Sequence, residues 1–244
     1  MNYDAHCHLD LMENMISIVR TLKEESIGIL AVGTTPRAFL KEAKMFGNVD
    51  NVHVALGLHP QLVGSGYDDW KLFKSLVQQS HYIGEVGLDF SKAYIDTKEQ
   101  QIEIFEKILL CCEQYGEKVI SIHSLKSAVA ILKTLSQLRH DRKNTYILHW
   151  FTGSPAQMKN AVDLGCFFSI NPQMLKTKSG INLIREIPPD RILIETDAPF
   201  SGKFENVKQL EKILHSMIDN ISMIKGIDIK KIIIRNQENV FTYR

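Results

Sequence analysis

Short apolar runs alternate with amphipathic stretches of helical spacing along most of this chain. The apolar runs, which we interpret as strands, cover residues 2–10, 27–32, 52–58, 82–88, 118–123, 146–149, 166–170 and 191–196. The helical stretches cover 15–25, 36–46, 68–79, 97–115, 127–138 and 155–164, followed by a helical or irregular segment at 176–186 and one or two helices from 206 onward. This alternation is typical of βα units around a parallel sheet. Eight units predict an α/β fold, a TIM (β/α)8 barrel that spans residues 1–244 as a single domain.

Charge and cysteine usage exclude several classes of protein. The formal net charge of +1 lacks the basic excess of proteins that hold nucleic acid mainly by attraction to phosphates. The four cysteines show no CxxC spacing and no framework, so we expect free thiols in a reducing compartment. The N-terminus shows no charged-then-apolar leader, and no apolar run is long enough to span a bilayer. We therefore expect a cytoplasmic protein with no membrane partner.

The first predicted strand carries two histidines, His6 and His8, separated only by Cys7. Because alternate side chains of a strand point to the same face, both imidazoles face the same way and can bind one metal. On its own, such a pair near an N-terminus has an ordinary explanation as two surface histidines. A metal ion also needs at least one further protein ligand, which must come from elsewhere in the chain.

Four later strand ends each carry one more ligand-type side chain: Glu85, His123, His149 and Asp197. In a TIM barrel the carboxyl ends of the strands converge on one face, where active sites are built. Taken singly, a histidine at a strand end is more often structural, and an aspartate before Ala-Pro is often a turn or helix cap. Six ligand-type side chains on one face predict a metal-dependent hydrolase type of barrel.

Six motifs occur in order along the chain: DAHCHLD at 4–10, GLHP at 57–60, GEVGLDF at 84–90, IHS at 122–124, HWFTGS at 149–154 and ETDAP at 195–199. Together they resemble the TatD family of metal-dependent deoxyribonucleases. The run GLHPQL at 57–62 and the tryptophan after His149 further resemble the QatD group, the TatD-like members of an anti-phage defence cassette.

The resemblance implies two divalent metal ions. His6, His8 and Asp197 would hold the first ion, His123 and His149 the second, and Glu85 would bridge them. Two such ions clamp a phosphodiester and activate a water molecule without a nucleophilic side chain. We expect Glu85 and Asp197 to be catalytic, with Asp197 as general base. A mixed imidazole and carboxylate shell favours zinc, manganese or iron over magnesium, and leaves the physiological ion open.

Four side chains around this set are candidate substrate contacts. His59 lies on the expected rim, although a histidine that caps a loop is an equal alternative. Trp150 and Phe151 offer stacking surfaces for a base, but aromatic residues beside strand ends are more often part of the core. Lys126 lies close to the position where most relatives have an arginine after His-Ser. Asp89 is a candidate for orienting a ligand histidine, with an ordinary loop carboxylate as the alternative.

We expect phosphodiester hydrolysis in DNA, which the resemblance implies starts from a 3′ end, with single-stranded DNA or an accessible 3′ end as substrate. Other proteins of an anti-phage defence cassette are the expected partners. An amidohydrolase-type enzyme that cleaves a C–N bond in a small molecule is the first alternative, because the same fold serves both reactions. A non-catalytic subunit whose metal site stabilises a docking surface is the second, although the complete ligand set argues against it.

Overall fold

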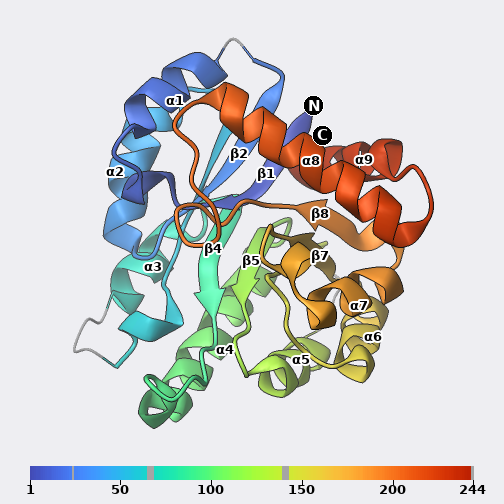
Figure 1. The fold of residues 1–244 in the computed structure, drawn as a ribbon. Coiled ribbons are helices and arrows are strands. Elements are labelled where there is room, and N and C mark those ends of the chain that lie inside the picture. Colours follow the sequence, from blue (N-terminus) through green and yellow to red (C-terminus); the bar gives the residue numbers. More distant parts are fainter. Residues whose placement is uncertain (24, 65–68, 139–142, 243–244) are drawn as a thin grey trace.

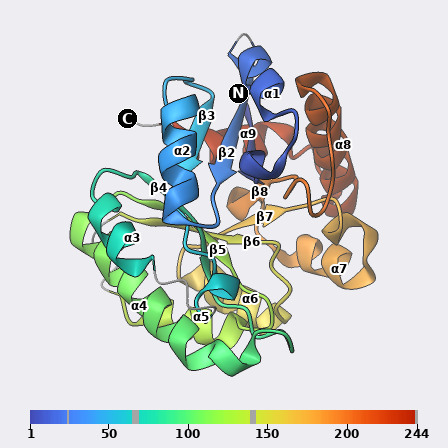
Figure 2. The same cartoon turned by 90° about the vertical axis from the view of Figure 1, so that its left-hand side faces the viewer.

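The computed structural model describes residues 1–23, 25–64, 69–138 and 143–242, and it has parallel strands surrounded by helices (Figure 1 and Figure 2). The strands of the described residues are β1 (Asn2–Cys7), β2 (Ile27–Val32), β3 (Val52–Ala55), β4 (Tyr82–Gly87), β5 (Val119–His123), β6 (Thr145–His149), β7 (Phe167–Ile170) and β8 (Ile192–Ile194). Their order follows the sequence, in one ladder from β1 to β3 and another from β4 to β8. The predicted TIM-barrel-like α/β fold is confirmed.

Two sets of contacts connect the ladders into a barrel. A parallel bridge between Leu56 and Ile83 joins the β3 and β4 sides. On the other side, the Asp197 amide donates to the His6 carbonyl and the His8 amide donates to the Ala198 carbonyl, both at 2.9 Å. The first and last strands therefore meet where the sequence places three candidate ligands.

The helices lie outside the strands, and α8 and α9 cover the side where β1 meets β8 (Figure 1). They are α1 (Met15–Leu22), α2 (Pro36–Phe46), α3 (Trp70–Leu76), α4 (Lys98–Tyr115), α5 (Ala128–Ser136), α6 (Pro155–Asp163), α7 (Lys178–Glu186), α8 (Val207–Lys225) and α9 (Lys230–Phe241). Short 3-10 helices cover Leu9–Leu11, Pro60–Leu62, Ile95–Thr97, Met174–Lys176 and Pro189–Arg191. The expected start of the third helix at residue 68 lies outside the described residues. Among those residues, no helix has the length and apolar character needed to cross a membrane.

Two helix starts follow directly from local sequence. Thr35 accepts a hydrogen bond from the Ala38 amide at 3.1 Å, and Pro36 occupies the first turn of α2, where its missing N–H costs nothing. Ser154 forms a capping box with Gln157 at the start of α6. Each helix therefore begins at a defined point a few residues after a strand end, and this keeps the connecting loops over the site short.

The apolar side chains form two layers. A large cluster fills the space between strands and helices, and a smaller one fills the amino-terminal end of the barrel interior. The smaller cluster combines strand residues with the end of α9: Tyr3, Ala5, Leu30, Val32, Ala55, Tyr82, Val119, Ile147, Leu193, Val240 and Phe241. These side chains fill one end of the barrel interior and leave the carboxyl-terminal end to the polar candidate ligands.

The first strand departs from the regular alternation that we expected over residues 2–10. Its pairing with β2 shifts register between Asp4 and Cys7. Tyr3 and Ala5 belong to the smaller cluster in the barrel interior, whereas Cys7 belongs to the large cluster between strands and helices. In a regular strand all three side chains would point to the same face, so the alternation is broken between Ala5 and Cys7. His8 lies beyond the strand and precedes a 3-10 helix. The expectation of a regular strand through His8 was therefore wrong, although both imidazoles do point to the same place.

Candidate metal centre

The six predicted ligands come together at the carboxyl-terminal end of the barrel. His6 comes from β1, His8 from the residue directly after β1, Glu85 from β4, His123 from β5, His149 from β6, and Asp197 from the loop after β8. All are buried except His123, which is partly exposed. Their polar atoms therefore face one another rather than solvent.

Glu85 lies at the centre of this group. Its Oε1 atom is 2.7 Å from His123 Nδ1 and 2.9 Å from His149 Nε2. Its Oε2 atom is 3.2 Å from His8 Nε2 and 3.5 Å from His6 Nε2. One carboxylate thus faces a pair of candidate ligand imidazoles at each oxygen, and His59 also lies beside Oε1.

Asp197 lies beside the first imidazole pair. Its Oδ1 atom is 3.8 Å from both His6 Nε2 and His8 Nε2. The residue adopts a φ of 48°, a conformation that is uncommon outside glycine. Its backbone is held there by the hydrogen bond from its amide to the His6 carbonyl and by its own carbonyl, which accepts from Phe200 and Ser201. The β8 loop and β1 are therefore positioned together.

Two glycines allow β4 to bring Glu85 into place. The pairing of β4 with β5 shifts register between Ile83 and Val86, and Gly84 has a φ of 153°. Gly87 has a φ of 139°, and a Cβ atom there would lie 2.1 Å from the His123 carbonyl oxygen. Only glycine permits this close approach, which holds the β4 end against the end of β5.

Three of the four candidate ligand histidines have a polar neighbour behind the ring. His6 Nδ1 is 2.8 Å from Ser121 Oγ, and His123 Nε2 is 3.3 Å from Asp89 Oδ2. His149 Nδ1 is 3.4 Å from Glu195 Oε1. Such neighbours orient metal-binding imidazoles. The sequence indicated Asp89 but not Ser121 or Glu195, although Ser121 precedes His123 by two residues in β5 and Glu195 precedes Asp197 by two.

The electrostatics of the centre favour an ionised Glu85. Burial opposes ionisation, but His59, His149 and His123 together hold the pKa of Glu85 well below its usual range. Burial raises the pKa of Asp197 to about 7, with His149 opposing and Glu195 adding to the shift. A bound cation would favour the carboxylate form of both residues.

His59 differs from the other histidines because its tautomer is defined. Its Nδ1 atom accepts a hydrogen bond from the Gln61 amide at 3.2 Å. Burial lowers the pKa of His59, so the ring is neutral and carries its proton on Nε2. This Nε2 atom lies 3.3 Å from Glu85 Oε1. His59 therefore presents an N–H donor to the site rather than a lone pair.

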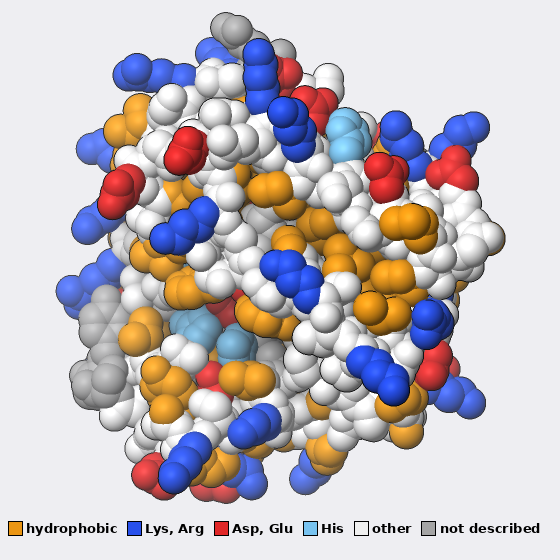
Figure 3. All heavy atoms as spheres, in the orientation of Figure 1, with side chains coloured by type: hydrophobic (Ala, Val, Ile, Leu, Met, Phe, Trp, Pro, Cys, Tyr) orange, Lys and Arg blue, Asp and Glu red, His pale blue; other side chains and the backbone are white. Residues whose placement is uncertain are grey.

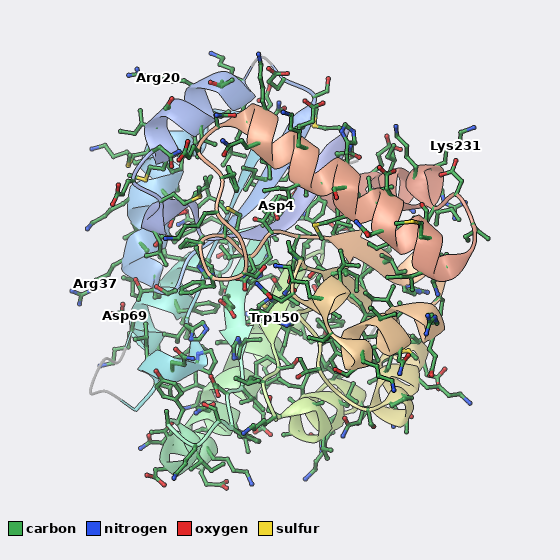
Figure 4. All side chains as sticks on the ribbon, in the orientation of Figure 1. Asp4, Arg20, Arg37, Asp69, Trp150 and Lys231 are labelled. Atoms are coloured by element: carbon green, nitrogen blue, oxygen red, sulfur yellow. The ribbon has the colours of Figure 1, made fainter. Side chains whose placement is uncertain are left out.

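The centre opens into a cavity of about 320 Å³ lined by His8, Thr34, His59, Gln61, Leu62, Glu85, His123, His149, Trp150, Asp197 and Phe200. Figure 3 shows histidine side chains in a hollow bordered by hydrophobic ones, and Trp150 lies near the centre of the same face in Figure 4. Phe200 is 63% exposed, and its ring meets His8 edge-on. The sequence did not indicate Phe200 as a wall of the site.

Two residues near the motifs lie away from this cavity. Phe151 is only 1% exposed and packs against Phe168, so it belongs to the core. Lys126 is exposed and is not among the residues that line the cavity. The described lining contains no lysine or arginine, so positive charge inside the cavity has to come from histidines or from bound cations.

The donor set fits a divalent metal. The paired nitrogens of His6 and His8 lie 3.3 Å apart, and those of His123 and His149 lie 3.4 Å apart, around one carboxylate. Groups of three potential ligand atoms lie within 4.8 Å of one another in His6–His8–Glu85 and in His59–Glu85–His123. Imidazole and carboxylate together suit zinc, manganese or iron. A barrel with this centre at its carboxyl-terminal end defines a metal-dependent hydrolase.

Comparison with known proteins specifies the family. Residues 3–243 match the model of the TatD-related DNase family, and the chain belongs to that family. The human deoxyribonuclease TATDN3 is 26% identical over 247 residues, covering 94% of this chain and 89% of its own. An uncharacterized metal-dependent hydrolase of Buchnera aphidicola is 26% identical over 250 residues, covering 93% and 92%. The crystal structure of the TatD homologue YjjV from Escherichia coli has a TM-score of 0.84 at 20% identity, covering 100% and 98%.

Proposed function

We propose that this enzyme hydrolyses phosphodiester bonds in DNA and removes nucleotides from an accessible 3′ end. The observation that carries the proposal is the position of Glu85 between two imidazole pairs, with Asp197 beside one pair, at the floor of an open cavity. Membership of the TatD-related DNase family and the name of the human relative support DNA as the substrate class.

We assign the ligands to two divalent ions. His6, His8 and Asp197 would hold the first, His123 and His149 would hold the second, and Glu85 would contact both. Two such ions supply the positive charge that clamps a phosphodiester and activates water. Zinc, manganese and iron match the donor set better than magnesium. Asp197, beside the first imidazole pair, is positioned to take a proton from the attacking water.

His59 donates a hydrogen bond to the scissile phosphate in this proposal. Its Nδ1 is already occupied as an acceptor by the Gln61 amide, so its Nε2–H is the group that faces the cavity. A neutral donor held at a fixed place is suited to charge that develops on a phosphoryl or leaving oxygen. This role distinguishes His59 from the metal-binding histidines around it.

Trp150 and Phe200 form aromatic walls for the terminal base. Both line the cavity, and their stacking surfaces are tolerant of base identity. The volume of about 320 Å³ lies at the lower end of small-ligand clefts, which suits one nucleotide of a single strand better than a duplex. Lys126, outside the cavity, is proposed to contact phosphates farther along the strand.

The cellular setting is a separate part of the proposal. The buried, unpaired thiols of Cys7, Cys111, Cys112 and Cys166 suit a reducing compartment, so we propose a cytoplasmic location. The sequence GLHPQL at 57–62 and Trp150 support a role in anti-phage defence together with other cassette proteins. Genes neighbouring this one test the cassette, and equal phage protection by wild type and Asp197→Asn would refute a catalytic role in defence.

Release of nucleotides from end-labelled single-stranded DNA tests the main proposal. The protein is assayed with manganese, zinc or magnesium and with EDTA, beside Asp197→Asn and the exposed control Asp190→Asn. We expect metal-dependent release from a 3′ end that Asp197→Asn lowers by at least ~10²-fold and Asp190→Asn leaves unchanged. Absence of release with every metal, from protein shown to hold metal, would refute a simple nuclease. Turnover of an amide by the same protein would then support the C–N hydrolase.

A further inference from the structure

Glu195 is a buried carboxylate at the junction of three loops. It follows β8, and its side chain is fully buried. Ser169 in β7 donates its hydroxyl to Oε2, and the Asn171 amide group donates to Oε1 at 3.3 Å. Burying a charge is costly unless hydrogen bonds compensate it. The Glu195 carboxylate therefore accepts hydrogen bonds from Ser169 and Asn171, and one side of Oε1 remains directed at the end of β6 and the loop after it.

That side of Oε1 faces His149. The His149 Nε2 atom lies 2.9 Å from Glu85, so the ring presents Nδ1 in the opposite direction, 3.4 Å from Glu195 Oε1. Among the described residues this buried nitrogen makes no hydrogen bond, and Glu195 Oε1 is the carboxylate oxygen that lies beside it. An imidazole that gives its Nε2 lone pair to a cation carries its proton on Nδ1, and this N–H needs an acceptor.

The His6 ring limits how His149 can move. The two rings are stacked with centroids 3.9 Å apart and an interplanar angle of 11°. Stacking restricts rotation of the His149 ring about its Cβ–Cγ bond. Glu195 lies at the Nδ1 edge of the ring, so it and the stacked His6 ring together restrict the direction of the Nε2 lone pair.

The same oxygen also holds the next residue. The Trp150 amide donates to Glu195 Oε1 at 3.2 Å, and Trp150 has a φ of 40°. A non-glycine residue keeps such a conformation only where its surroundings impose it. Trp150 lines the cavity directly after His149. Glu195 Oε1 thus contacts both the His149 ring and the backbone amide of Trp150, whose side chain lines the cavity.

We propose that Glu195 is a positioning residue that directs His149 toward the second metal ion and, through the Trp150 amide, sets the aromatic wall for the terminal base. The proposal rests on the metal assignment proposed above. A purely structural Glu195 would only tie the β7 and β8 loops together, and its loss would then change stability without a selective effect on one ion.

The test is a metal titration of Glu195→Gln and Glu195→Ala, with Ser169→Ala as the matched control. Ser169→Ala removes a donor to the same carboxylate but does not touch His149. Manganese and zinc are titrated against a chromophoric chelator in the absence of DNA. We expect Glu195→Ala to weaken one of two ions by ~10–100-fold and to leave the other near wild type. Glu195→Gln keeps an acceptor oxygen and should lose less, and Ser169→Ala should bind both ions like wild type.

Equal affinities of wild type and Glu195→Gln for both ions would overturn the proposal, even where the alanine variant does not fold. Equal losses in Ser169→Ala and the Glu195 variants would also overturn it, because they would indicate a structural effect. KM for single-stranded DNA should rise in Glu195→Ala and not in Ser169→Ala. Wild type that binds two ions but releases no nucleotides would refute the DNase proposal while leaving the titration decisive for Glu195.

Discussion

The buried carboxyl group of Glu42 provides a quantitative test of how burial affects the stability of this fold. It lies in α2, its side chain is 3% exposed, and neither carboxylate oxygen has a hydrogen-bond partner in the described part of the chain. Burial, with a further contribution from the Asp10 carboxylate, raises the pKa of Glu42 to about 8. The folded protein therefore keeps Glu42 protonated over a pH range in which the unfolded chain ionises it.

The sign and size of the effect follow from this shift. Between pH 4.5 and about 8 the folded state binds the extra proton, so the free energy of unfolding falls as pH rises. Each pKa unit corresponds to about 1.36 kcal/mol, so the whole window corresponds to roughly 5 kcal/mol of unfolding free energy. Glu42→Gln has nearly the shape of the protonated acid and cannot ionise. It should match wild type near pH 5 and exceed it by several kcal/mol near pH 8.5.

Urea unfolding at a series of pH values, with EDTA present so that metal binding does not contribute, measures this difference. Glu186→Gln removes the same charge from an exposed site on α7 and should follow the wild-type pH dependence. A Glu42→Gln curve parallel to wild type from pH 5 to 8.5 would refute the reasoning, because it would mean that Glu42 reaches solvent or a cation in solution.

Three further substitutions test separate parts of the structure. Ser121→Ala removes the neighbour of His6 Nδ1 and should weaken one metal ion by ~10-fold in a chelator titration; unchanged affinity would contradict this. Phe151→Ala empties a buried site against Phe168 and should cost ~3–5 kcal/mol in urea unfolding, and a loss below ~1 kcal/mol would mean that the ring is not core. His59→Gln should keep both ions yet slow nucleotide release by ~10²-fold, whereas loss of an ion would make His59 a ligand.

The sequence predicted the framework of the fold because its signals are local. Residues 27–32 and 36–46 match β2 and α2 at both ends, since a continuous apolar run and a proline after a capping threonine mark those boundaries. The convergence of the six candidate ligands was also predictable, because the carboxyl ends of the parallel strands meet on one face of the barrel. A feature that depends only on strand order and side-chain type could therefore be predicted.

Features that depend on contacts between distant segments were not predictable. The register shift between Asp4 and Cys7 arises where β1 pairs with β2, and no residue pattern within 2–10 indicates it. Thr196 donates its hydroxyl to the buried Asp4 carboxylate at 2.6 Å across 192 residues of sequence. The exposure of Phe200 likewise follows from the backbone of the loop after β8, because its hydrophobic side chain alone indicates burial.

Anomalous diffraction from crystals grown with manganese or zinc would show how many ions the centre holds and which side chains bind them. We expect two peaks per chain, about 3.5–4 Å apart on either side of Glu85. One peak should contact His6, His8 and Asp197, and the other His123 and His149. A single peak, or peaks away from Glu85 in protein whose metal content is confirmed by elemental analysis, would contradict the two-ion centre.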